Sequence, residues 1–208
     1  MSDLDAGGIG STAPGHYGAA GSDITLAETA IAAAWNVQGD PARPTFVEKA
    51  ERLFDIVLPL APNTMTRSAT RTALWLAPKS WLLIAGVDAR QPLPPGDFTS
   101  RRDALNAAGG ALFDVSASRV AFGVGGMHAG SVLAKSCPLD LHPRSFPTGV
   151  CAQSVLGRVN ALICKHDETP EFIVIVARSF ARDAWRTLCV SAAQYGYDVA
   201  APLTVGER

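Results

Sequence analysis

The clearest periodic pattern of apolar residues lies near the end of the chain. These residues recur at three- and four-residue spacing, so they fall on one face of a helix: Ala181, Ala184, Trp185, Leu188 and Ala192. Ser179 precedes the pattern and Gly196 follows it, as expected for a helix with an N-cap residue at its start and a glycine at its end. The pattern therefore predicts an amphipathic helix that packs on the core.

A second helix is expected near the N-terminus. Thr25 and Glu28 have the spacing of a capping box, in which each side chain bonds to the backbone of the other residue. An alanine-rich run continues to Trp35, and Pro41 and Pro44 then interrupt the chain. The prediction is a small helix near residues 26–35, which could pack against another subunit as well as against its own domain.

Short apolar runs bounded by turn residues predict most of the other elements to be strands. Strands are expected at 54–58, 72–76, 81–84, 111–116, 119–124, 150–164 and 171–177. The segment 150–164 is either one long strand or a hairpin, with Gly157 as a candidate bulge. Further helices are expected at 100–108 and from Gly125-Gly126 to about Leu133.

The order of these elements predicts the fold class. Pairs of strands mix with single helices, which disfavours a doubly wound parallel sheet. We expect an α+β fold, with an antiparallel or mixed sheet and helices on one face, in the ferredoxin-like split βαβ arrangement. The length of 208 residues suits a single domain, placed at residues 23–208. Residues 1–22 are rich in Gly and Ala with few large apolar groups, so we expect a tail bound by a partner chain.

Composition and charge narrow the classes of partner. Hydrophobic residues make up 48% of the chain and charged residues 18%, which indicates a globular protein with some surface covered by a partner. The formal net charge is −1 and no run of Lys or Arg occurs, so nucleic acid is not an expected partner. The longest strongly apolar run, 172–177, is too short to span a membrane, and no signal peptide is recognisable. We therefore expect a cytoplasmic protein without membrane contact.

A glycine-rich stretch at 122–128 lies where a dinucleotide-binding loop would be, between a predicted strand and a predicted helix. The G-x-G-x-x-G pattern requires Gly or Ala at position 128, where the chain has His128. A P-loop is excluded because Lys135 is too distant and no G-K-[ST] occurs. We interpret Gly125-Gly126 as a steric requirement of the turn.

Other reactive side chains form no recognised pattern. The four histidines have no metal-ligand spacing: His16, His128, His142 and His166. The four cysteines lack C-x-x-C spacing and are expected to be buried and reduced: Cys137, Cys151, Cys164 and Cys189. Cys151 and His142 would form a nucleophile–base pair only if the fold brought them together.

Polar residues elsewhere also have structural explanations. Asp114 and Ser116 fit a turn better than a nucleophile site, since no G-x-S-x-G surrounds the serine or Ser118. The segment 140–144 could bind a carboxylate through Arg144, or be a loop held by side-chain hydrogen bonds. Three tryptophans are expected in the core: Trp75, Trp81 and Trp185. We predict no catalytic, cofactor-binding or metal-binding residue in this chain.

An ordered set of short motifs resembles a known family. Residues 75–83, WLAPKSWLL, resemble the "LGP-x-x-W-LL" hairpin of the aminomethyl-folate-binding fold, and 114–119, DVSASR, resemble its "D-x-S-x-x-R" strand pair. The turn and helix that follow are matched by 122–133, with Ala129 and Leu133 in register. The remaining motifs come in the same order, at 139–141, 146–149, 178–181, Trp185 and Leu188. From about Ala73 to Gly196 the set resembles the gamma subunit of heterotetrameric sarcosine oxidase.

The resemblance implies a fold like the folate-binding domain of the glycine-cleavage T-protein. It implies a non-catalytic structural subunit that assembles with alpha, beta and delta subunits. FAD, FMN and NAD are then expected in those partner subunits and no cofactor in this chain. The complex of that family oxidatively demethylates sarcosine to glycine, with hydrogen peroxide formed and the one-carbon unit passed to tetrahydrofolate.

Two departures from the pattern leave alternatives open. No acidic residue aligns with the folate-contacting carboxylate of the T-protein, and the N-terminal Gly/Ala tail has no counterpart in the wider fold, so folate binding is not assigned. A related N-methylglutamate dehydrogenase has a similar small subunit. The alternatives are therefore that subunit, or a free-standing folate-binding protein or enzyme of the same fold.

Overall fold

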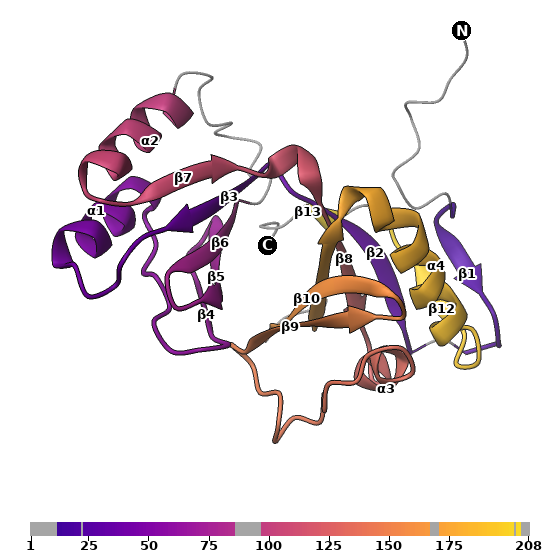
Figure 1. Ribbon diagram of the computed structural model, residues 1–208. Helices are drawn as coiled ribbons and strands as arrows, with labels where there is room; N and C mark the ends of the chain where they lie inside the picture. Colours follow the sequence, from indigo (N-terminus) through magenta and orange to yellow (C-terminus); the bar gives the residue numbers. More distant parts are fainter. Residues whose placement is uncertain (1–11, 22, 86–96, 167–170, 202, 205–208) are drawn as a thin grey trace, which may run out of the picture. The chain divides into compact units, whose positions relative to one another are not determined.

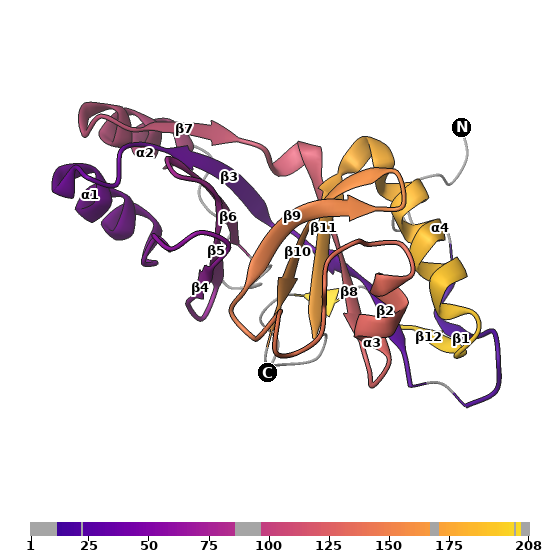
Figure 2. The same cartoon turned by 60° about the horizontal axis from the view of Figure 1, so that its bottom comes forward.

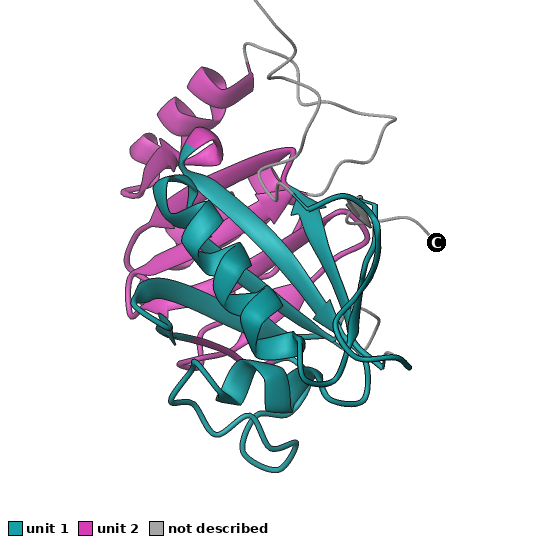
Figure 3. Cartoon of the chain, turned by 90° about the vertical axis from the view of Figure 1, so that its right-hand side faces the viewer, with its two compact units in different colours: residues 1–30, 118–149, 153–203 teal, residues 31–117, 150–152, 204–208 magenta. Residues whose placement is uncertain are grey.

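The structure, a computed structural model, describes residues 12–21, 23–85, 97–166, 171–201 and 203–204. The chain forms two compact units (Figure 3). Unit 1 comprises residues 1–30, 118–149 and 153–203, and unit 2 comprises residues 31–117, 150–152 and 204–208. We expected a single domain over 23–208; its described residues divide between these two units, which are built on two separate sheets.

Unit 1 is built on a mixed sheet (Figure 1). Its strands lie in the order β1 (Gly15–Tyr17), β12 (Tyr197–Val199), β2 (Thr25–Ala30), β8 (Arg119–Gly125), β11 (Phe172–Ala177), β10 (Val159–Lys165) and β9 (Cys151–Leu156), and β13 (Leu203–Thr204) pairs with β2. β12 runs parallel to β2, whereas β2, β8, β11 and β10 are antiparallel. The segment 150–164 is thus a hairpin, with Gly157 in its turn.

Two helices cover one face of this sheet (Figure 2). They are α3 (Ala129–Ala134) and α4 (Ala181–Ala192), the latter preceded by the 3-10 turn η2 (Arg178–Phe180). Phe122 pairs with Val174 across β8 and β11, so these residues share a face with Phe172. Phe122 contacts Trp185 of α4 at a centroid distance of 5.3 Å, and Phe172 lies beside Gly130 of α3.

The predicted α+β class, with helices on one face of an antiparallel or mixed sheet, is confirmed. The ferredoxin-like detail is not confirmed. A β-α-β-β-α-β fold has fewer strands than the 8-stranded sheet that the described residues form.

Unit 2 is an antiparallel five-stranded sheet with two helices. The strand order is β4 (Met65–Arg67), β5 (Arg71–Ala77), β6 (Ser80–Ala85), β3 (Ala33–Gln38) and β7 (Ala111–Asp114). The helices are α1 (Pro44–Phe54) and α2 (Asp97–Ala107), and the 3-10 turn η1 (Ser116–Ser118) follows β7. Aromatic rings join α1 to the sheet, since Phe46 contacts Trp81 and Phe54 contacts Trp35. Trp81 and Trp185 are buried as predicted, whereas Trp75 is only partly buried.

The helix predicted near residues 26–35 is wrong, because this segment forms β2 and β3. Thr25 lies in β2 opposite Gly125 and is not a helix cap. Ala34 and Trp35 are both buried, on opposite faces of β3, as alternation in a strand requires. Backbone pairing with β8 and β6 overrides the helix preference of alanine, which is only a weak effect per residue.

The strand predicted at 54–58 is also wrong, because Phe54 is the last residue of α1. Asp55 follows in the left-handed conformation, with a φ of 48°. Pro44 does not interrupt this helix but begins it, where its missing N–H leaves no bond unmade.

Residues 12–21 of the expected N-terminal tail are described, and they belong to unit 1. These residues pair with their own unit: β1 is antiparallel to β12, and Tyr17 stacks on Tyr197 at 5.6 Å. The indole N–H of Trp185 donates to Thr12 Oγ1 at 2.9 Å. Backbone pairing and one aromatic ring fix the segment without the large apolar groups whose absence suggested a tail. Residues 1–11 and 22 lie outside the described residues, so a partner contact there stays a prediction.

The β1–β12 contact is predicted to depend on pH through His16. Its Nδ1 lies 2.9 Å from Asp198 Oδ1 and its Nε2 lies 2.8 Å from the Ala19 carbonyl oxygen. Both partners are acceptors, so both ring nitrogens donate only when the ring is an imidazolium. The Asp198 hydrogen bond first, and the Ala19 carbonyl second, raise the pKa of His16 above 6.5.

A raised pKa in the folded state stabilises the fold fully below pH 6.5, and this contribution is lost as pH rises through the folded-state pKa. We expect NMR titration to place the His16 pKa above 6.5, and the Tyr17 amide to lose exchange protection at higher pH. His16→Gln should abolish this pH dependence, while His128→Gln should leave it intact. A His16 pKa at or below 6.5 would contradict the prediction.

Candidate functional site

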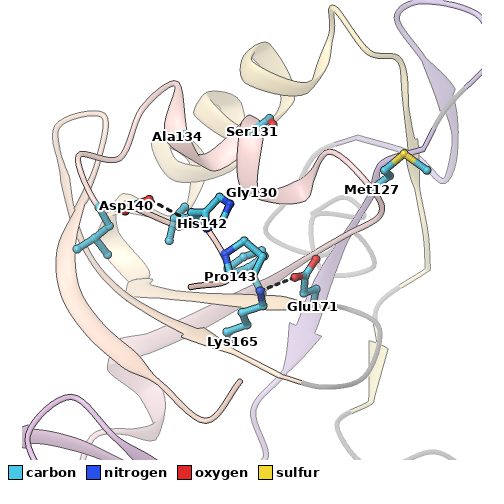
Figure 4. A pocket seen from close by; sticks show the side chains of 12 residues that line it. Met127, Gly130, Ser131, Ala134, Asp140, His142, Pro143, Lys165 and Glu171 are labelled. Carbon is cyan, nitrogen blue, oxygen red and sulfur yellow. Dashed lines mark hydrogen bonds and ion pairs between the residues drawn. The ribbon is translucent and has the colours of Figure 1, made fainter. Parts of the chain in front are cut away.

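A pocket of about 340 Å³ lies beside α3 in unit 1 (Figure 4). Gly130 and Ser131 of α3 form one wall, and the loop 139–143 forms another. The third wall comes from the end of β10, the start of β11 and the residue just before β11: Lys165, Phe172 and Glu171. Segments separated by some 40 residues in the sequence thus supply the polar groups of one pocket.

An ion pair lies in this pocket (Figure 4). Lys165 pairs with Phe172 across the β10–β11 ladder, so both side chains point to the same side of the sheet. Lys165 is only 6% exposed. Its Nζ lies 2.9 Å from Glu171 Oε1 and 5.3 Å from the centre of the Phe172 ring. A buried charge requires such a partner, and Glu171 supplies it.

The loop that faces this ion pair is held by its own side chains. Asp140 Oδ1 accepts the His142 backbone N–H at 3.1 Å, and Oδ2 accepts the Ser145 hydroxyl at 2.5 Å. These hydrogen bonds, the one from Ser145 foremost, lower the pKa of Asp140. Of the two interpretations of residues 140–144, the structure supports the loop held by side-chain hydrogen bonds.

The same loop determines which nitrogen of His142 carries the proton. Nδ1 accepts the Arg144 backbone N–H at 3.2 Å, so in the neutral ring the proton lies on Nε2. His142 therefore offers a hydrogen-bond donor to the pocket that it lines. With Lys165, Glu171 and Asp140, the pocket combines two kinds of donor with two carboxylates, which suits the binding of a polar small molecule.

The glycine-rich stretch 122–128 has the steric role that the sequence suggested. Residues 122–125 end β8, and α3 begins only at Ala129. Gly126 has a φ of +105°, and a Cβ added there would lie 1.5 Å from the Asp23 carbonyl oxygen. The turn thus needs glycine for the close approach of two backbones.

The candidate nucleophiles are occupied by structural contacts. Cys151 Sγ lies 3.2 Å from the Thr64 carbonyl oxygen and 3.7 Å from that of Trp75, and burial raises the pKa of its thiol to about 11. Ser116 Oγ donates to Asp114 Oδ1 at 2.6 Å and accepts the Ala34 backbone N–H. The turn role assigned to Asp114 and Ser116 is confirmed.

One cysteine–histidine pair that the structure brings together was not identified from the sequence. Cys164 Sγ and His166 Nε2 lie 3.5 Å apart, and both residues are buried. The signal was their two-residue spacing at the end of a strand, which places both side chains on one face. None of the four cysteines, all of them described, forms a disulfide; Cys137, Cys151 and Cys164 are buried and Cys189 is half-buried.

The described part of the chain has neither a cluster of metal-ligating side chains nor a helix that could span a membrane. No group of three or more His, Cys, Asp and Glu side chains in it could hold a metal ion. None of its helices is long and apolar enough to cross a membrane.

Large apolar side chains remain exposed on both units. The most exposed is Met127, at 82%, beside the pocket, and the others are Val57, Leu60, Phe113, Phe180 and Val190. Where large exposed apolar side chains lie close together, they are typical of a surface that another protein covers.

Comparison with known proteins gives a consistent result. Residues 38–194 match the family described as sarcosine oxidase, gamma subunit family. The chain is 31% identical over 160 residues to sarcosine oxidase subunit gamma of Corynebacterium sp. strain P-1, covering 76% of this chain and 74% of that protein. It is 30% identical over 146 residues to the subunit of the same name from strain U-96, covering 70% and 68%.

Comparison with solved structures gives the same family. A chain of the heterotetrameric sarcosine oxidase from Corynebacterium sp. U-96, in complex with pyrrole 2-carboxylate, superposes with a TM-score of 0.74 at 25% identity, covering 86% of this chain and 88% of that chain. The glycine cleavage system aminomethyltransferase T from Bartonella henselae superposes with a TM-score of 0.57 at 15% identity, covering 89% and 49%. The second likeness shows a shared fold alone.

Proposed function

Since the chain belongs to the sarcosine oxidase gamma subunit family, we propose that it works as the gamma subunit of a heterotetrameric sarcosine oxidase. The observation that carries the proposal is the family match over residues 38–194. The TM-score of 0.74 with a chain of a heterotetrameric sarcosine oxidase supports it.

The reaction proposed for the whole complex is oxidative demethylation of sarcosine to glycine, with hydrogen peroxide formed and the one-carbon unit passed to tetrahydrofolate. We place FAD, FMN and NAD in the alpha, beta and delta subunits, and the complex in the cytoplasm. For this chain the proposed role is structural. The structural hydrogen bonds of Ser116 and the raised pKa of Cys151 support that role, because neither side chain is poised as a nucleophile.

The contact with partner subunits is proposed to involve the exposed apolar side chains. Met127 and Val190 in unit 1 and Phe113 in unit 2 stand at least half exposed, which is unfavourable in water. Covering them in an assembly removes this cost. We no longer propose residues 26–35 as a contact with a partner subunit. They form β2 and β3, and each of these strands lies between two other strands of its sheet.

A native purification tests the assembly. The chain is tagged, purified from its host, and its native mass and visible absorption are recorded. We expect a yellow complex with three other subunits, and sarcosine-dependent formation of peroxide. A control purification from cells without the tag shows which subunits are retained by the tagged chain.

Other outcomes would assign another function. A complex that oxidises N-methylglutamate and not sarcosine would be a related N-methylglutamate dehydrogenase. A colourless species near the mass of the chain itself would contradict the proposal. Saturable binding of a reduced folate by that species would identify a free-standing folate-binding protein.

A further inference from the structure

The buried ammonium of Lys165 has more hydrogen-bonding capacity than its neighbours use. An ammonium carries three N–H donors. Among the described residues, one hydrogen-bonding partner is present, Glu171 Oε1 at 2.9 Å, and the Phe172 ring lies on another side. Buried donors without an acceptor are costly, so such a group is expected to meet water or a ligand in its pocket.

Two further groups of the pocket have free capacity within the described structure. His142 uses Nδ1 for the Arg144 N–H, which leaves its Nε2–H as a donor. Glu171 binds Lys165 through Oε1, which leaves Oε2 as an acceptor on a side chain that is 38% exposed. The pocket therefore offers donors for a carboxylate and, beside them, an acceptor for an amino group.

The charge balance selects the ligand. Lys165 contributes one positive charge, and Glu171 and Asp140 contribute two negative charges. A ligand with a carboxylate alone would add to the negative excess of a partly buried site. A ligand with an amino group alone would leave the donors of Lys165 and His142 unused. A zwitterion meets both requirements and adds no net charge.

We propose that this pocket binds a small zwitterionic amino acid, with its carboxylate on Lys165 and His142 and its ammonium group on Glu171. The walls formed by Met127, Leu139 and Phe172 are apolar and suit a short aliphatic side chain. A volume of about 340 Å³ is at the lower end of known ligand pockets, which is consistent with a small ligand.

Methionine methyl groups provide a local readout in the full chain. The sequence has three methionines, of which Met127 lines the pocket and Met65 lies in β4 of unit 2. The chain is labelled with ¹³C at the methionine methyl groups, and Met127→Leu assigns the signal. L-Alanine should shift the Met127 signal saturably and leave that of Met65 unmoved. Propionate and L-alaninamide should each bind at least about tenfold more weakly, since each lacks one charged contact.

Matched variants test the two charged contacts. Lys165→Met and Glu171→Gln should each weaken L-alanine binding at least about tenfold. Lys79→Met removes an exposed ion pair with Asp40 and should leave binding unchanged. An unaltered Met65 signal shows that unit 2 is folded, and an unchanged far-UV circular dichroism spectrum shows that the whole chain is. Lys165→Arg replaces Lys165→Met where the spectrum changes.

The proposal is overturned if no probe shifts the Met127 signal, if propionate binds as well as L-alanine, or if both charge variants bind like the parent. These readouts are independent of assembly. The native mass tests the proposed function, and the methyl shifts test the pocket, so failure of one is distinguishable from failure of the other.

Discussion

Replacing Trp81 with alanine is expected to lower the free energy of unfolding by about 4–5 kcal/mol. Trp81 is fully buried in β6, where its ring packs on Phe46 of α1 at 5.9 Å. Its indole N–H donates to the Pro59 carbonyl oxygen at 2.7 Å. The substitution therefore leaves a large cavity between the sheet and α1, and also a buried carbonyl group that has lost its donor.

Urea unfolding of the full chain, followed by far-UV circular dichroism, measures this loss. Trp81→Phe keeps most of the ring and removes only the N–H donor, so we expect a loss of about 1–2 kcal/mol. Leu60→Ala is the surface control, because this side chain is 57% exposed and should change stability by less than about 1 kcal/mol. A Trp81→Ala variant as stable as Leu60→Ala would show that this core does not hold unit 2 together.

The consequence extends to assembly. Folded domains are stable by only about 5–15 kcal/mol, so a loss of this size removes about a quarter of that stability or more and raises the unfolded population accordingly. If the chain is a subunit of a larger enzyme, the Trp81→Ala variant should be recovered in the purified complex at a fraction of the parent level.

Strands with short apolar runs could be predicted from the sequence because their signal is local. Residues 72–76 and 81–84 are the β5–β6 hairpin, in which Trp75 lies opposite Trp81. The motif at 75–83 is informative about the fold because its residues form a single hairpin. The order of such motifs, more than any single one, indicated the family.

The errors came from local preferences that tertiary contacts override. The alanine-rich residues 26–35 favour a helix in isolation, but in the fold they form β2 and β3, which belong to two different sheets. The missed helix α1 did carry a signal, because Phe46, Ala50 and Phe54 recur at four-residue spacing and are all fully buried. Pro44 obscured it, being taken as the end of a helix when it begins one.

The pocket could not be predicted in the same way. Ser131, His142 and Lys165 belong to a helix, a loop and a strand, and only the packing of α3 on the sheet brings them together. No spacing in the sequence relates them. The hydrogen bond from the Arg144 N–H that fixes the His142 proton is local, but its relevance appears only beside the Lys165–Glu171 ion pair.

Replacing Gly126 with alanine is expected to lower the free energy of unfolding by about 3–5 kcal/mol. The added Cβ would lie 1.5 Å from the backbone oxygen of Asp23, so the chain before β2 or the turn after β8 must move. A φ of +105° is itself strained for alanine. Both effects act where β2 and β8 pair in the centre of the sheet.

Gly149→Ala separates the two effects, because Gly149 has a φ of +85° but no atom within 4 Å of an added Cβ. This control should lose only about 1–2 kcal/mol, from backbone strain alone. Thermal and urea unfolding of the three proteins gives the difference. If Gly126→Ala and Gly149→Ala are equally destabilised, the close approach of Asp23 does not restrict position 126, and the steric explanation of the glycine-rich turn fails. If Gly126→Ala is clearly the less stable, the glycine pair is explained by packing between β2 and β8, without any cofactor loop.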